Sequence, residues 1–200
     1  MRRQRDKGNK IGKFMVYFMG FIMIGSLFGI IFLGFGGGGN QASPARISYN
    51  DLEFFNRGSF WSTNVNGIEA LFTYPPTDLE LIIADNSAID RLKNRVQIDV
   101  TSDFNDTYAE GIALAQYQMG ITLNNFNIFS RSGFTTAQGH NLPVFSCSSA
   151  TINVPVVYFK SGNSTRIYIE DNCIIAESVF PEDVIRIKDR LVYGILGIIR

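Results

Sequence analysis

The sequence is poor in the side chains on which most catalytic and metal sites depend. Its 200 residues include two cysteines and one histidine, His140, which lies in a Gly-rich stretch typical of an exposed loop. Cys147 and Cys173 are too far apart for the CxxC spacing that lowers a thiol pKa, and two cysteines with one histidine make a poor zinc site. No GxSxG, GxxxxGK[ST] or HExxH pattern occurs either. The sequence therefore indicates no catalytic residue, cofactor or metal ligand, and an enzyme has no motif to support it.

One long stretch has no charge at all. Residues 14–36, FMVYFMGFIMIGSLFGIIFLGFG, would span a bilayer core of about 30 Å as a helix. The segment 1–13 before it carries one acid and six basic residues, namely Arg2, Arg3, Arg5, Lys7, Lys10 and Lys13. Because basic residues stay on the cytoplasmic side, we predict a cytoplasmic arm over 1–13, a single transmembrane helix over 14–36, and the rest of the chain outside the cell membrane.

A secretory signal peptide is the alternative to this anchor, since such peptides also begin with basic residues. Its apolar region is shorter, about 7 to 15 residues, and the nearest small-residue cleavage candidate, Ser43-Pro44-Ala45, contains proline. We therefore favour an uncleaved signal anchor. Gly25 and Gly29 form a GxxxG pair, which allows two such helices to approach closely and is a candidate homodimer contact.

A Gly-rich tether over 37–45 leads to a domain over 46–200. Without the charges of the arm, twelve basic and seventeen acidic residues remain, which gives the domain a formal charge of −5. This balance disfavours nucleic acid as a partner. The expected partners are the lipid bilayer, through residues 14–36, and a protein at the cell surface.

The first part of the domain begins with three short apolar stretches over 47–74. Turn sequences at Asn56-Arg57-Gly58 and at Asn66-Gly67 separate them, which predicts a three-stranded meander. Its crowded aromatic side chains are expected to be core, with a partner platform as the alternative. Alternating apolar residues over 96–100 predict a fourth strand, and capping-box patterns at Thr77 and Thr107 predict helices over 79–84 and 107–123.

The second part of the domain reads as further strands and a final helix. Strands are predicted over 126–136, 142–146, 154–160, 165–170 and 173–176, with a hairpin turn at Ser161-Gly162-Asn163. Pro181, followed by two acids, opens a C-terminal helix. Strand runs with two or three helices and no regular βαβ alternation predict an α+β domain on a mostly antiparallel sheet.

Cys147 and Cys173 are the first candidate site residues. Both fall in the predicted outer domain, where disulfides persist, and each lies beside a predicted strand. We predict a structural disulfide, which would stabilise the fold by on the order of 3 to 4 kcal/mol on the loop-entropy model. A redox or metal site is the alternative. Val154-Pro155 and the strands after it resemble the Pro-strand-Gly-strand hairpin of thioredoxin-like domains, but only locally.

Two further patterns are candidate sites on the outer domain. Asn105-Asp-Thr and Asn163-Ser-Thr are N-glycosylation sequons and become acceptors if the host glycosylates. Four polar residues lie close enough in sequence to suggest a calcium site, namely Asp99, Asp103, Asn105 and Asp106. The EF-hand pattern requires glycine and glutamate where the chain has Tyr108 and Leu114, so helix-start capping explains them better.

The stretches NVPVVYFKSGNSTRIYIEDNCII over 153–175 and KDRLVYGILGI over 188–198, with the tethered meander, carry a resemblance. Together they resemble a group of small uncharacterised single-pass membrane proteins of small-genome, DPANN-type archaea. The resemblance implies a membrane location, an outer domain and a bridge between Cys147 and Cys173. It transfers no catalytic residue.

Three functional hypotheses follow from the sequence. The leading one is a non-enzymatic, membrane-anchored binding or structural domain at the cell surface. The second is a membrane-tethered thioredoxin-like redox protein, or another enzyme, that uses Cys147 or Cys173. The third is a pilin-like surface subunit, although the glycine and acidic residue expected where a mature pilin helix begins are missing.

Overall fold

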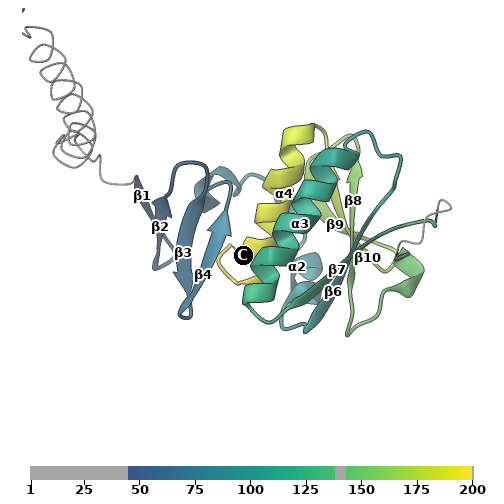
Figure 1. The fold of residues 1–200 in the computed structure, drawn as a ribbon, viewed down its shortest axis with the longest axis horizontal. Helices are drawn as coiled ribbons and strands as arrows, with labels where there is room; N and C mark the ends of the chain where they lie inside the picture. The colour runs from purple at the N-terminus through teal and green to yellow at the C-terminus, as the bar shows by residue number, and fades with distance from the viewer. Residues whose placement is uncertain (1–44, 138–142, 200) are drawn as a thin grey trace, which may run out of the picture. The chain divides into compact units, whose positions relative to one another are not determined.

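A computed structural model of the chain describes residues 45–137 and 143–199 (Figure 1). The chain divides into two units, Met1–Ser43 and Pro44–Arg200. The predicted arm, the predicted membrane span, the Gly25 and Gly29 pair and His140 all lie outside the described residues. Within the described ranges, no helix is both long and apolar enough to cross a membrane.

The first sheet of the domain is a four-stranded antiparallel meander. Its strands follow one another in chain order, β1 (Arg46–Tyr49), β2 (Leu52–Asn56), β3 (Trp61–Val65) and β4 (Ile68–Phe72). The predicted meander is confirmed with one strand more than expected. Asn50 and Asp51 have φ angles of 46° and 64°, the left-handed conformation that a two-residue hairpin turn requires. An Asn-Asp turn is a weaker signal than Asn-Gly, so the sequence pattern predicts one strand where the structure has β1 and β2.

The second sheet has six strands in the order β5-β9-β10-β8-β6-β7 (Figure 1). Its strands are β5 (Ile83–Ala84), β6 (Gln97–Ser102), β7 (Phe129–Phe134), β8 (Val156–Ser161), β9 (Arg166–Glu170) and β10 (Cys173–Ser178). Only β9 and β10 pair antiparallel, and the other four pairs are parallel. The prediction of a mostly antiparallel sheet is therefore wrong for this larger sheet, while the α+β class is confirmed.

The physical reason for the parallel pairing lies in β8 and β10. β10 is buried along its whole length and β8 along half of it, which is typical of parallel strands covered on both faces. β10 lies between β8 and β9, so the predicted hairpin of 154–160 with 165–170 does not form. The residues predicted as a strand over 142–146 contribute a single bridge, between Val144 and Phe134.

Three α-helices complete the described domain, α2 (Asn86–Leu92), α3 (Ala109–Asn125) and α4 (Pro181–Ile195), and the last is C-terminal as predicted. Short 3-10 turns occur at η1 (Pro76–Asp78) and η2 (Cys147–Ser149). Neither capping box forms. The helix predicted over 79–84 is replaced by a turn and β5, and the N-cap of α3 is Tyr108, not Thr107.

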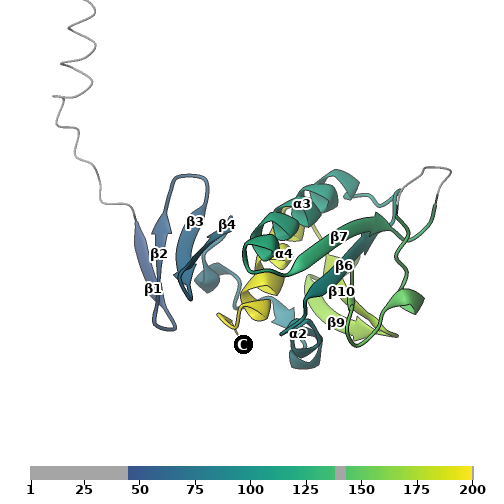
Figure 2. The same cartoon turned by 60° about the horizontal axis from the view of Figure 1, so that its bottom comes forward.

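The main core lies between the larger sheet and its helices. Figures 1 and 2 show α3 and α4 together on one face of this sheet. Strand alternation sends Ile98 of β6, Phe159 of β8 and Ile174 of β10 into the same buried cluster as residues of both helices. The small sheet joins this core because Phe72 of β4 stacks on Tyr193 of α4, with ring centroids 3.9 Å apart.

Candidate functional site

The loop between β7 and β8 reaches the face of the large sheet opposite the helices. It starts as an extension of the sheet, since Phe134 donates its N–H to the carbonyl of Pro143 and Phe145 donates to the carbonyl of Phe134, each at 2.9 Å. Gly133 permits this approach. A Cβ on Gly133 would lie 2.5 Å from the Pro143 oxygen, closer than real Cβ contacts. The glycine is therefore required for the loop to lie against β7.

An ion pair between a half-exposed arginine and a buried aspartate fixes the same end of the loop. Asp99 of β6 is 4 % exposed and accepts two hydrogen bonds from Arg131 of β7, at 2.9 and 2.7 Å. The Arg131 guanidinium also lies over the ring of Phe145, 4.7 Å from its centroid. The hydrogen bond to Asp99 raises the pKa of Arg131. Asp99 therefore serves the packing of the loop and not a calcium site.

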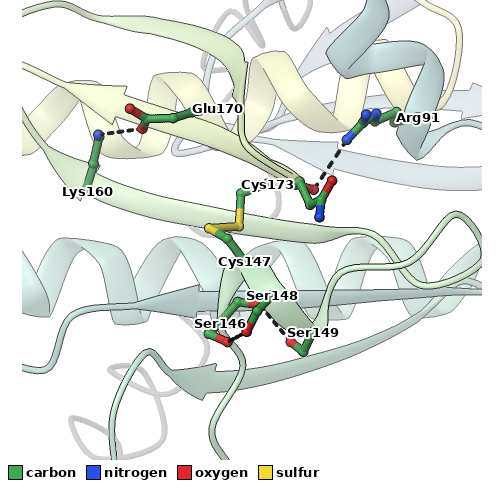
Figure 3. Close-up of a disulfide and its surroundings, with 9 residues drawn as sticks. Arg91, Ser146, Cys147, Ser148, Ser149, Lys160, Glu170 and Cys173 are labelled. Atoms are coloured by element: carbon green, nitrogen blue, oxygen red, sulfur yellow. Dashed lines mark hydrogen bonds and ion pairs between the residues drawn. A yellow bond between two sulfur atoms is a disulfide. The ribbon is translucent and has the colours of Figure 1, made fainter.

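The predicted disulfide is confirmed and fixes the other end of the loop. It joins Cys147 in η2 to Cys173, the first residue of β10, across 26 positions of sequence (Figure 3). Cys173 is fully buried beside Val156 and Ile175. Since these are the only cysteines of the chain, neither thiol is free in this state.

A pocket of about 110 Å³ lies where the disulfide brings the loop to the start of β10. One wall is the loop after Cys147, with Ala150, Thr151, Ile152 and Pro155, and another is Asn172, next to Cys173. The remaining wall is Arg91 of α2 together with Arg95, which follows the end of that helix. The disulfide thus ties two walls of the pocket to each other, and the volume suits a few water molecules or one small ion.

The two arginines are not neutralised by the described protein. Arg91 donates to the carbonyl of Asn172 at 3.3 Å (Figure 3), and the Nε of Arg95 donates to the carbonyl of Arg91 at 2.9 Å. Lys93, which lies between them in sequence, pairs with Asp90 at 2.9 Å, whereas neither arginine has a carboxylate within 4 Å among the described residues.

The chemistry of this pair points to anions. Each guanidinium has five N–H donors in a fixed fork, and each uses one of them in the bonds above. The fork geometry matches the paired oxygens of carboxylate, phosphate and sulfate groups. Thr151 adds a hydroxyl from the loop wall of the pocket. The pocket can therefore recognise a small oxyanion.

The other predicted site residues lie at the opposite end of the sheet from the pocket, just after the C-terminal ends of β6 and β8. Asn105 and Asn163, the candidate glycosylation acceptors, are both exposed there. Asp106 accepts hydrogen bonds from the backbone of Tyr108 at 2.8 Å and of Ser161 at 2.9 Å, and Asp103 accepts one from the backbone of Asn105. These acids hold turns, and no group of three potential metal ligands occurs in the described ranges.

Sequence reasoning missed Arg91 and Arg95. The sequence shows two arginines four positions apart, but Asp99 lies four positions after Arg95, so this spacing alone gives no signal for a pocket. Arg91 lies at the end of α2 and Arg95 beyond it, and the pocket is built from three segments that are distant in sequence.

No protein family model, curated protein or solved structure matches the chain. The resemblance to small archaeal membrane proteins stays a prediction, and the function has to be argued from the pocket.

Proposed function

We propose that the chain is a membrane-anchored binding protein whose outer domain takes a small oxyanion between Arg91 and Arg95. The observation that carries this proposal is a pair of guanidinium groups that have no carboxylate partner in the described part of the chain and that line a pocket whose walls a disulfide joins. The disulfide supports an oxidising location, and the uncharged stretch over 14–36 supports the anchor.

Recognition suits the pocket better than catalysis. Its lining residues include no carboxylate, histidine or thiol that would accept or deliver a proton. Two fixed cations with spare N–H donors bind and orient an anionic group, and this is the chemistry that they supply. These features support a binding domain whose ligand is a phosphate, sulfate or carboxylate group.

The charge of the domain limits the size of this ligand. The pocket is a local positive site on a domain whose formal charge is −5. Such a background repels an extended polyanion but leaves a single anionic group free to enter the pocket. A small anion, or a single acidic group of a larger and otherwise uncharged molecule, is compatible with this electrostatic field.

The two other hypotheses gain no supporting observation. The redox reading needs a reactive thiol, and both cysteines are joined to each other. The pilin-like reading depends on the N-terminal segment, which lies outside the described residues.

Calorimetric titration of the full-length protein in detergent with inorganic phosphate, sulfate and acetate tests the proposal. We expect saturable binding of at least one anion with a Kd below about 1 mM, equivalent to about −4.1 kcal/mol. The double variant R91M/R95M should bind at least about tenfold more weakly. K93M is the matched control, because it removes a cation from the same segment that already has Asp90 as a partner. Equal binding by the wild type and R91M/R95M would contradict the proposal.

A further inference from the structure

The outward face of α3 is unusually free of charge. The helix has one charged residue, Glu110, in its first turn, and its exposed side chains include Leu114, Tyr117 and Ile121 at helical spacing. Tyr117 is 66 % exposed. A helix face in contact with water normally carries charged and polar residues, and a charge-depleted face with an aromatic residue is typical of the centre of a protein interface.

This face has a hollow on each side of the helix. A groove of about 200 Å³ lies between α3 and β4, with the exposed side chains of Phe60 and Leu71 on its rim. We call it the α3–β4 groove. A second hollow of about 360 Å³ lies between α3 and β7, where Gly120 and Phe129 line it. Tyr117 and Ile121 lie on the helix face between these two hollows.

The floor of the α3–β4 groove carries polar groups with unused hydrogen-bonding capacity. Lys188 is 2 % exposed, and its ammonium has one hydrogen-bond partner among the described residues, Asp189. Two of its three donors are therefore left over. The Oε1 atom of Gln118, which lines the same groove, is buried and has no hydrogen-bond partner in the described part of the chain. Buried polar groups in this state favour an occupant that supplies both an acceptor and a donor.

We propose that a second copy of this chain covers this face, with the two α3 helices in contact and Tyr117 of each copy in the α3–β4 groove of the other. A phenol hydroxyl is both a donor and an acceptor, so it matches the unused acceptor of Gln118 and the unused donors of Lys188, which turn toward the groove to bond it. The ring fills the apolar part of the groove between Phe60 and Leu71. Knob and groove lie on the same face, as a two-fold symmetric contact requires.

The chain outside the described residues favours a second copy over another partner. A tether of the length predicted over 37–45 reaches at most about 30 Å, so it holds each domain close to the membrane in which the span over 14–36 is anchored. Confinement to one plane raises the effective concentration of the copies toward each other. The contact face is uncharged, so two domains of formal charge −5 meet without opposing like charges at its centre. The inference uses the anchor of the proposed function but not the arginine pocket.

Disulfide trapping in the membrane tests the contact in the full-length chain. Two differently tagged copies, one carrying Tyr117→Cys and the other Leu71→Cys, are co-expressed and oxidised in isolated membranes. We expect a mixed dimer that reductant reverses. The matched control replaces Leu71→Cys with Leu81→Cys, since Leu81 is an equally apolar side chain, is 92 % exposed and lines neither hollow. Equal trapping at both positions, or a crosslink from Tyr117→Cys to a different protein, would overturn the proposal.

Sedimentation equilibrium of the full-length protein in detergent separates this contact from one through the anchor. Tyr117→Asp places a charge on an exposed position that the fold does not need, and it should raise the dimer dissociation constant at least about thirtyfold. Tyr117→Phe keeps the ring and loses the hydroxyl, so we expect a rise of about threefold to tenfold. A dimer that survives Tyr117→Asp and is lost in the double variant G25I/G29I would assign the contact to the anchor and contradict the proposal. Phosphate titration of Tyr117→Asp should match the wild type, which distinguishes failure of this inference from failure of the proposed function.

Discussion

The two faces of the six-stranded sheet are covered by different means. On one face, α3 and α4 bury a continuous apolar cluster that includes the aromatic side chains of the small sheet. On the other face, one loop is held by a disulfide, by the pair of Asp99 with Arg131, and by a small cluster around Cys173. The helical face is stabilised by many contacts and the loop face by a few specific bonds. The loop also supplies most of the pocket lining, so the site should be separable from the fold by mutation.

The largest effect should come from the helical face, in Asp189→Ala. Asp189 is fully buried, accepts hydrogen bonds from the backbone of Thr73 and Tyr74 at 2.8 and 2.9 Å, and pairs with Lys188. Its removal leaves a buried ammonium and two backbone donors without their acceptor. We expect the free energy of unfolding to fall by about 3 to 5 kcal/mol in urea denaturation. Glu69→Ala, at an exposed position of β4, is the control, and a loss below about 1 kcal/mol for Asp189→Ala would contradict this account of the helical face.

The disulfide of the loop face should give the next largest effect. The double variant C147S/C173S should lose about 3 to 4 kcal/mol of unfolding free energy on the loop-entropy model. The comparison of the two faces adds a sharper expectation, because the helical core does not involve these residues. The far-ultraviolet circular dichroism spectrum should stay that of the wild type while phosphate binding is lost. Loss of helical structure together with binding would show that the two faces are not separable.

The ion pair of the loop face should matter less than the disulfide. Arg131→Met leaves the buried Asp99 carboxylate without its cation, and we expect the free energy of unfolding to fall by about 1 to 3 kcal/mol. Arg131→Lys keeps the charge and loses the two-bond geometry, so it should lie between Arg131→Met and the wild type. Urea denaturation measures the unfolding free energies of the three proteins. Equal values for all three would show that the pair of Asp99 with Arg131 does not stabilise the loop face.

The smallest expected effect is a pH dependence from Glu177, on the loop face of β10. Burial alone would raise the pKa of Glu177, but hydrogen bonds from the Asn163 backbone, Tyr168 and Arg166 lower it on balance below its ordinary value of 4.5. A carboxylate whose pKa is lower in the folded state adds stability above its unfolded pKa, and this stability is lost as the pH falls through the folded pKa. The stability of Glu177→Gln should therefore depend less on pH than that of the wild type below about pH 5. Parallel curves for the two proteins would contradict the assignment.

The sequence predicts the parts of this molecule that local patterns determine. The structure contains the hairpin at Asn66-Gly67, the strand predicted over 96–100 (β6), the C-terminal helix and the disulfide. Turn residues, the alternation of apolar and polar side chains, and the oxidising compartment predicted for the domain indicate them. Strand order depends on contacts distant in sequence, so the insertion of β10 between β8 and β9 has no local signal.

The pocket could not be predicted from the sequence, because it also depends on contacts between residues distant in sequence. Arg91 and Arg95 meet Thr151 and Asn172 only after α2, the loop and β10 have come together. The capping-box pattern at Thr77 predicts a helix over 79–84, ahead of the real one at Asn86–Leu92.

The most direct test of the binding account is a magnetic resonance titration of the isotope-labelled full-length protein with inorganic phosphate. It would follow the side-chain Nε–H resonances of Arg91 and Arg95, with that of Arg131, which is bonded to Asp99, as the internal reference. The account predicts that the resonances of Arg91 and Arg95 shift together and saturate, while that of Arg131 stays in place. Unchanged resonances of Arg91 and Arg95 across the titration would contradict it.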